Sequence, residues 1–175
     1  MQKQGFTIIE LVIVISVLVI LIGIAIPRMK GMQDAAYIAK VKHELATLQS
    51  AVESYYAFST PHTYPNSSAG YMAQPALINA SPQIISTYLY DPFCSSSVNS
   101  CSGHYQEYGY IGPDNIGGAQ YYVIWSVGPA AQPSSMCGLY SDGSVALYNG
   151  PSGPPTLCTA GSPGCPICVT NGKGC

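Results

Sequence analysis

Glu10 is the charged residue with the most unusual setting in this chain. It interrupts residues 6–26, FTIIELVIVISVLVILIGIAI, which contain no other charged side chain. As a helix this run extends about 30 Å, which is the thickness of the hydrocarbon core of a bilayer. A carboxylate inside hydrocarbon is energetically costly, so it is normally paired with a cation or used in a function. Glu10 is therefore the first candidate functional residue.

Cysteines are the other residues with obvious chemistry. All of them follow residue 93: Cys94, Cys101, Cys137, Cys158, Cys165, Cys168 and Cys175. We expect disulfides and an oxidising compartment rather than zinc, because the tail has one C-x2-C pair where zinc sites usually have two. Cys94 and Cys101 enclose a polar loop that a disulfide can close. The four tail cysteines allow three pairings, and the odd total leaves one cysteine over, for which Cys137 is the first candidate.

Signals for other chemistry are weak. The histidines have no nucleophile or acid partner at a catalytic spacing: His43, His62 and His104. The sequence contains no Gly-x-Ser-x-Gly elbow and no Gly-rich phosphate loop. Calcium needs about six to eight oxygen ligands, for which Asp114 and Asp142 are weak candidates, since Asp142 is more typical of an Asp-Gly turn. We therefore expect no enzyme, no metal site and no cofactor, with calcium possible but doubtful.

Charge is scarce and unevenly distributed along the 175 residues. Only 8% of the residues are charged and the net charge is −2, which excludes a nucleic-acid binder that works through a basic surface. Residues 1–58 hold nine of the fourteen charges and no cysteine. Residues 59–175 hold 13 of the 14 prolines and 15 of the 18 glycines. These differences predict two physically distinct parts, a long helix and a domain rich in turns.

The helix is predicted over residues 6–58. After Pro27, apolar residues recur at intervals of three and four and form one stripe: Ile38, Val41, Leu45, Leu48, Val52 and Tyr55. We expect this stripe to pack on the following domain. Pro61 ends the helix because it disfavours a helical conformation at the residue before it. Gly23 and Pro27 are the expected places for a bend or a melted turn.

The remaining residues predict a small antiparallel sheet, and the fold class is α+β. Aromatic and β-branched runs bounded by turns indicate strands at residues 105–111, 120–127, 139–140, 145–148 and 167–170, with a hairpin turn at Asp142-Gly143. Ser81 and Pro82 are typical of a helix start, so a short helix is predicted over 82–88. We place the sheet domain at 59–157 and a Cys-rich tail at 158–175.

The N-terminus, MQKQGFTIIE, resembles the signal of type IV pilins and type II secretion pseudopilins. It has a short polar leader, Gly5 followed by Phe6, Glu10 fifth after that junction, and Pro27 near the end of the apolar run. The resemblance implies a pilin-like fold, a leader at 1–5, cleavage after Gly5 by a prepilin peptidase, and N-methylation of Phe6. It also implies that residues 6–26 span the membrane first and form the filament core later. Glu10 would then neutralise the new amine on Phe6 of a neighbouring copy and set the axial register.

Part of the domain also resembles the major pseudopilin of type II secretion. Asp91-Pro92-Phe93 and residues 122–128 are similar to stretches of that family, but Pro129 and two alanines stand where the family has an Asp-rich calcium loop. The leading hypothesis is therefore the major pseudopilin of a type II secretion system, driving protein export. The alternative is a type IV pilus pilin for adhesion, twitching motility or DNA uptake. A second alternative is a single-span anchored extracytoplasmic binding or redox module.

The same resemblance implies partners and a location. The partners are copies of the chain, minor pilins or pseudopilins, the prepilin peptidase, an inner-membrane assembly platform, and the membrane before assembly; nucleic acid is expected only for a DNA-uptake pilin. The location is a single pass through the cytoplasmic membrane with the N-terminus inside and the domain periplasmic or otherwise extracytoplasmic, followed by a periplasmic or cell-surface filament. A count of positive residues alone favours the reverse orientation, because four of them follow the span: Arg28, Lys30, Lys40 and Lys42.

Overall fold

The structure is a computed structural model of the chain. It describes residues 6–67, 73–94, 107–113, 120–129, 136–149, 156–158 and 165–175, and it leaves out the side chains of 25–30, 136, 148–149 and 156–158. The chain divides into two compact units, residues 1–36 and 37–175, each of which we describe by itself.

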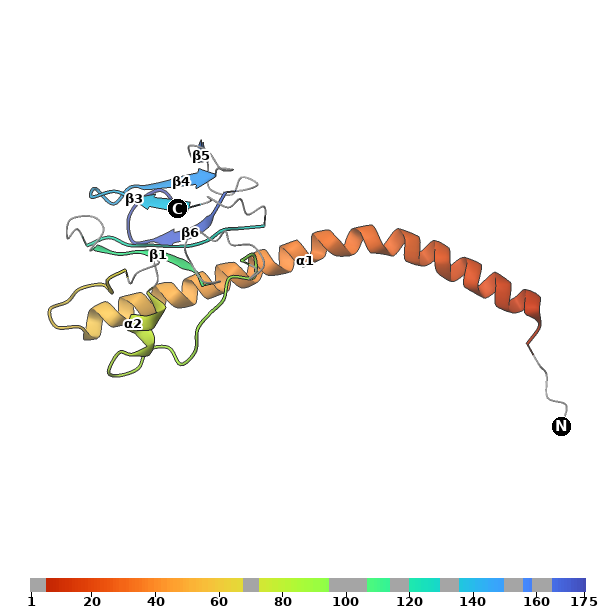
Figure 1. The fold of residues 1–175 in the computed structure, drawn as a ribbon, viewed down its shortest axis with the longest axis horizontal. Coiled ribbons are helices and arrows are strands. Elements are labelled where there is room, and N and C mark those ends of the chain that lie inside the picture. Colours follow the sequence, from red (N-terminus) through yellow and green to blue (C-terminus); the bar gives the residue numbers. More distant parts are fainter. Residues whose placement is uncertain are drawn as a thin grey trace. The chain divides into compact units, whose positions relative to one another are not determined.

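Helix α1, Ile8–Phe58, contains 51 residues and confirms the predicted long helix (Figure 1). The helix continues without interruption through Gly23 and Pro27, so neither residue marks a melted turn. At the other end, Ser59 N donates to Tyr55 O (2.8 Å), and the Ser59 hydroxyl accepts a hydrogen bond from Thr63 N (3.0 Å). The chain therefore turns away from the helix just before and around Pro61, where the sequence predicted the helix to end.

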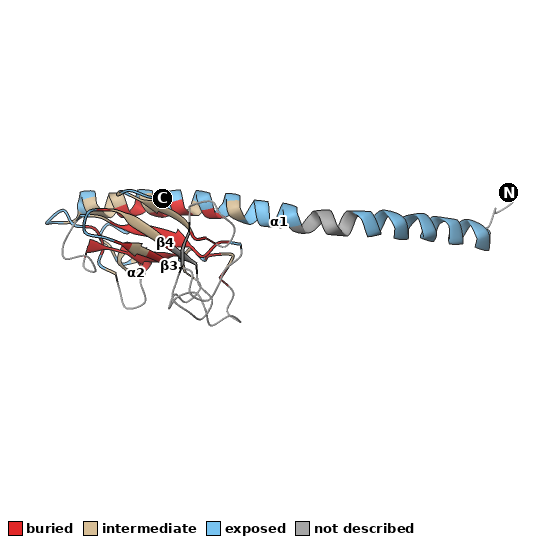
Figure 2. Cartoon of the chain, turned by 90° about the horizontal axis from the view of Figure 1, so that it is seen from above, coloured by how far each residue is buried: buried red, intermediate tan, exposed pale blue. Residues whose placement is uncertain are grey.

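The second half of α1 packs through the predicted apolar stripe. Val41, Leu45, Leu48 and Val52 are buried, while Ile38 and Tyr55 at the two ends of the stripe are half-buried. Figure 2 shows this one-sided burial as alternating red and blue along the part of the helix that lies on the domain. The spacing of three and four residues thus predicted which face of the helix is covered.

Behind the helix lies a sheet of three antiparallel strands in the order β1-β2-β6: β1 (Gly109–Ile111), β2 (Val123–Ser126) and β6 (Ile167–Thr170). Because side chains alternate across a strand, Tyr110 and Ile124 enter the core shared with α1. Val123 and Trp125 enter a second core on the opposite face. β2 is therefore buried on both faces, which explains its continuous run of apolar residues.

A second antiparallel sheet covers that opposite face and is ordered β3-β4-β5: β3 (Met136–Leu139), β4 (Val145–Asn149) and β5 (Thr156–Cys158). Its core residues Cys137, Leu139 and Leu147 pack in one cluster with Val123 and Trp125. Unit 37–175 thus has three layers, namely helix, sheet and sheet, which Figure 1 shows. The predicted hairpin around Asp142 and Gly143 is confirmed, but it lies in a second sheet, and β5 was not predicted.

The predicted helix over 82–88 is wrong. The short helix is α2, Gln74–Ile78, with a proline in its first turn and Leu77 fully buried. Downstream, the backbone of Leu89 bonds to the Gln74 side chain, N to Oε1 at 2.7 Å and O to Nε2 at 2.9 Å. Tyr90 pairs with Glu107 in an isolated antiparallel bridge. These bonds hold the end of the segment extended, and a helix there would break them.

Candidate assembly site

The N-terminal unit presents apolar side chains without protein cover. Every described side chain at residues 6–24 and 31–36 is exposed, and Phe6 and Ile8 are 82% and 85% exposed. Figure 2 shows this part of α1 in uniform pale blue. A continuous apolar surface of this kind marks a site that contacts another chain or a membrane.

Among the described side chains, which omit residues 25–30, no helix is both long enough and apolar enough to cross a membrane. The membrane span at residues 6–26 stays a prediction.

Glu10 is held at the start of α1 by Thr7. Its Oε2 accepts hydrogen bonds from Thr7 N (3.2 Å) and from the Thr7 hydroxyl (3.0 Å), while Glu10 N donates to Thr7 Oγ1 (3.3 Å). This is a reciprocal capping box, and it places the carboxylate where unpaired amides and the helix dipole favour negative charge. Thr7 follows Phe6, so Glu10 lies close to the predicted cleavage point; Gly5 lies outside the described residues.

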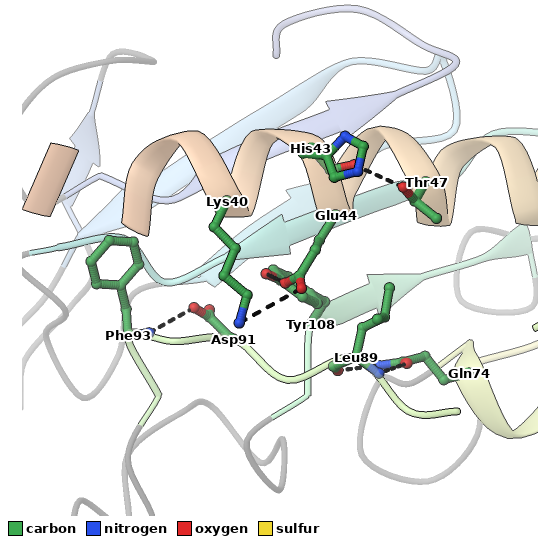
Figure 3. A network of polar contacts seen from close by, with 9 residues as sticks. All are labelled: Lys40, His43, Glu44, Thr47, Gln74, Leu89, Asp91, Phe93 and Tyr108. Carbon is green, nitrogen blue, oxygen red and sulfur yellow. Dashed lines mark hydrogen bonds and ion pairs between the residues drawn. The ribbon is translucent and has the colours of Figure 1, made fainter. Parts of the chain in front are cut away.

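The second half of α1 is tied to the domain by carboxylate–tyrosine hydrogen bonds. Tyr108, which is buried, donates from its hydroxyl to Glu44 Oε2 at 2.5 Å, and Lys40 Nζ lies 3.7 Å from Glu44 Oε1. Figure 3 shows the three side chains converging between helix and sheet. Burial, together with the bond to Glu44, raises the pKa of Tyr108 well above its ordinary value. The neutral phenol is therefore the form that this position stabilises.

Further along α1, Glu53 accepts two hydrogen bonds of the same kind. Its Oε1 accepts from the Tyr122 hydroxyl at 2.7 Å and its Oε2 accepts from the Tyr64 hydroxyl at 3.1 Å. Burial and the bonds to Glu53 raise the pKa of both tyrosines. Glu44 and Glu53 lie off the apolar stripe, and the sequence analysis did not identify these contacts. The available signal was their position beside the stripe, opposite a domain rich in tyrosine.

Asp91 connects the segment after α2 to the end of β2. It is 3% exposed, and its two oxygens accept from Phe93 N (3.0 Å) and Val127 N (2.9 Å). Burial raises the pKa of Asp91 even though these hydrogen bonds act in the opposite direction. Figure 3 shows the Asp91 carboxylate beside Glu44 and Tyr108. The Asp91-Pro92-Phe93 stretch, which resembles a stretch of the pseudopilin family, therefore lies at the same contact between α1 and the domain.

Four of the five cysteines whose side chains the structure describes are disulfide-bonded. Cys168 and Cys175 form a disulfide, Cys94 and Cys165 are each disulfide-bonded, and Cys137 is free and buried. Burial raises the pKa of the Cys137 thiol. Cys101 and the side chain of Cys158 lie outside the described part of the chain. The disulfide expectation is thus confirmed for the 168–175 pair, and Cys137 is the cysteine that the odd count had singled out.

A metal centre is not evident in the described ranges, where no group of three His, Cys, Asp or Glu side chains is arranged to hold an ion. Asp142 accepts from Ser144 N (3.0 Å) and from the Ser144 hydroxyl (2.6 Å), which is a turn-forming role. The bonds from Ser144 lower the pKa of Asp142. Asp114 lies outside the described residues. Calcium binding therefore stays untested.

The comparisons with known proteins find one family pattern and several relatives. The pattern of the prokaryotic N-terminal methylation motif matches residues 1–26. The chain is 27% identical over 148 residues to type II secretion system core protein G of Klebsiella pneumoniae, which covers 77% of this chain and 91% of that protein.

Two other relatives match the chain over a shorter length and at higher identity. Fimbrial protein EcpB of Eikenella corrodens is 43% identical over 53 residues, 30% of this chain and 33% of that protein. The type IV narrow pilus major component PilA5 of Thermus thermophilus is 43% identical over 60 residues, 34% of this chain and 48% of that protein. The chain thus spans about a third and about half of these two relatives. No solved structure matches the chain.

Proposed function

We propose that this chain is the major pseudopilin of a type II secretion system. Its N-terminal methylation motif is that of the pilins and pseudopilins, and the chain is a structural subunit of that kind. The observation that carries the proposal is the length of the similarity to core protein G. At 148 residues that similarity extends well beyond the 51 residues of α1 and includes much of the sheet domain. The shared N-terminus alone would not separate a pseudopilin from a pilin.

The mechanism that we propose is polymerisation through the apolar half of α1. Residues 6–24 expose large apolar side chains on all sides of the helix. Exposing so much apolar surface to water is energetically unfavourable. Before assembly the membrane covers them, and after assembly the same residues of other copies do. The layered domain at 37–175 has its own core and stays outside as the body of each subunit.

Glu10 links the two states of the subunit. Cleavage after Gly5 leaves a positive amine on Phe6, and an unpaired charge of either sign is costly in hydrocarbon. In the free subunit the Glu10 carboxylate is engaged by Thr7 at the helix start. In the filament it neutralises the Phe6 amine of a neighbour, which fixes the axial position of one copy against the next, as single buried polar groups do in coiled coils.

A type IV pilus subunit is the second candidate, and the 43% identity to EcpB and PilA5 favours it. Deleting the gene in the source cells separates the two. Loss of proteins normally exported to the medium, with surface filaments intact, supports the pseudopilin. Loss of surface filaments with normal export refutes it and supports the pilin.

Glu10→Ala tests the mechanism common to both candidates. We expect processing after Gly5 to be unchanged, because the scissile junction lies four residues away from the substitution, and filament formation to be lost. Glu10→Gln is the matched control for the helix cap, since its amide oxygen can still accept from Thr7 while carrying no charge. Normal filaments from the Gln variant would contradict the charge-neutralisation argument.

A further inference from the structure

A pocket of about 280 Å³ lies at the C-terminal end of α1. One wall comes from residues 55–63, which contain the last turn of α1 and the turn that follows it, and the other comes from residues 80–84, downstream of α2. Tyr55 and Ile84, one from each wall, are half-buried and pack against the core shared by α1 and the first sheet. The pocket is therefore built on the packed domain by two segments that are distant in sequence.

Hydrogen bonds within each wall hold the pocket in shape. The Ser59 hydroxyl accepts from Thr63 N (3.0 Å) and donates to Thr63 O (2.9 Å), which fixes the turn after α1. In the other wall, Ile84 N donates to Leu77 O (3.2 Å), and Leu77 is fully buried in the core. The pocket is thus formed in advance of any ligand, which lowers the entropic cost of binding.

The lining of this pocket carries no charged side chain. Glu53, the acidic residue nearest to Tyr55 in the sequence, is engaged by Tyr64 and Tyr122. A phosphate or a carboxylate is usually bound through a cationic side chain, and a metal ion through several oxygen, nitrogen or sulfur ligands. The pocket therefore suits an uncharged ligand.

Aromatic rings supply the apolar part of the lining. Tyr55 and Phe58 are three positions apart on α1, so their side chains are neighbours on the helix surface. Phe58 is 66% exposed, which leaves its ring accessible to a ligand. The negative face of an aromatic ring attracts the positive edges of C–H groups. A ligand with a flat array of C–H groups would therefore pack well here.

Hydroxyl groups supply the polar part of the lining. Those of Tyr55, Thr60 and Ser81 make no hydrogen bond within the part of the chain that the structure describes. Each hydroxyl can both donate and accept, and the hydroxyls of a sugar have the same double capacity. A pyranose ring also carries C–H groups on its faces, so it matches both parts of the lining.

We propose that this pocket binds one neutral pyranose, such as the terminal unit of a glycan. The C–H face of the sugar packs on Phe58 and Tyr55, and its hydroxyls bond to Thr60 and Ser81. A volume of about 280 Å³ is close to the lower end of the range for ligand pockets, about 300 to 1,000 Å³, which favours a single ring over a longer chain. This binding goes beyond the filament function and does not depend on it.

Saturation-transfer NMR of the full chain tests the proposal, with D-glucose, D-galactose and N-acetyl-D-glucosamine as separate probes. The chain is kept in dodecylphosphocholine, because detergents with sugar headgroups would compete for the pocket. A hexose has about twelve non-hydrogen atoms, and the binding efficiency typical of drug-sized ligands then gives a Kd of about 2 mM. We expect at least one of the three sugars to bind with a Kd of this order.

Three variants locate the bound sugar. Phe58→Ala removes the exposed ring and should raise the Kd about five-fold. Ser81→Ala removes one hydrogen-bonding group and should raise it by a similar factor. Tyr140→Ala is the matched control, because Tyr140 is also an exposed aromatic residue, 50% exposed, and follows β3 in the second sheet; it should leave the Kd unchanged. Circular dichroism checks that each variant keeps its fold.

Several results would overturn the proposal. One is the absence of binding for all three sugars at 20 mM, tenfold above the expected Kd. Another is a Kd that Phe58→Ala leaves unchanged in a folded protein, since the sugar would then bind elsewhere. Binding of a proline-rich peptide without any response to the sugars would assign the pocket to a peptide. Self-association of the domain that Phe58→Ala abolishes, again without sugar binding, would assign it to a second copy.

Discussion

Replacing Glu53 with Ala removes the acceptor of two buried phenols at once. Tyr122 is fully buried and Tyr64 is 8% exposed, so neither hydroxyl has ready access to bulk water. A hydrogen bond to a charged group contributes about 1.5 to 3 kcal/mol, which sets an upper value of about 6 kcal/mol for the pair. Glu53 is only half-buried, and water entering the space that it leaves recovers part of this. We expect a loss of about 2 to 3 kcal/mol in the free energy of unfolding.

The assay is thermal unfolding of the full chain in detergent, followed by near-ultraviolet circular dichroism of the tyrosines. For a domain of this size the loss corresponds to a fall in Tm of about 5 to 10 °C. Lys42→Ala is the matched control on the same helix, because Lys42 is exposed. Tyr122→Phe and the double variant complete the cycle. Strictly additive effects of Glu53→Ala and Tyr122→Phe would mean that the 2.7 Å contact carries no coupling energy, and the reasoning would be refuted.

The other predictions concern pH, packing and one buried carboxylate. The pKa values of Tyr64, Tyr108 and Tyr122 are raised in the folded state. Above a pH of about 10 the folded state therefore retains protons that the unfolded state loses, and the free energy of unfolding falls by up to about 1.4 kcal/mol per pH unit for each tyrosine. A denaturant midpoint that does not change between pH 9 and 11 would contradict this. Gly109→Ala places a Cβ 2.3 Å from the Trp125 ring and should cost about 1 to 3 kcal/mol with a change in Trp125 fluorescence. Asp91→Ala leaves the amides of Phe93 and Val127 without their acceptor and should cost about 2 to 4 kcal/mol in urea unfolding, whereas an effect below half a kcal/mol would show that water replaces it.

Periodicity predicted the parts of the fold in which one face of an element is buried. The stripe from Val41 to Val52 follows from side-chain spacing. The strand at β2 was predicted from its aromatic and β-branched residues, but the burial of both its faces was not. The hairpin at Asp142 follows from local turn chemistry, since the Asp142 carboxylate bonds to Ser144 and Gly143 takes a positive φ.

The errors arose where distant residues decide the local structure. Ser81 and Pro82 look like a helix start, yet the helix lies at Gln74–Ile78, and the side chain of Gln74 holds Leu89 extended from fifteen residues away. The strands form two sheets because β3 and β4 pack on the face of β2 that carries Trp125. No local sequence pattern specifies this packing. The carboxylate–tyrosine bonds join residues as far apart as Glu53 and Tyr122, so only the fold brings them together.

The N-terminal site at Gly5, Phe6 and Glu10 is a prediction that rests on a motif of nearby residues. Gly5, Phe6 and Glu10 lie within six residues of one another, so a short motif can define them. The capping box joins Thr7 to Glu10, three positions later. Its proposed partner, the Phe6 amine of another copy, lies outside one subunit, so the role of the carboxylate stays a prediction. What the structure adds is the exposed apolar surface around it, which requires an outside partner.

The central claim is that this chain is processed after Gly5 and assembled through its N-terminal helix. Mass spectrometry of the protein in filaments sheared from the source cells, or in the membrane fraction if no filaments form, tests it most directly. The account predicts a chain that begins at Phe6, carries one added methyl group on its amine, and is found in filaments. An unprocessed chain that begins at Met1, present only as a membrane-bound monomer, would contradict it.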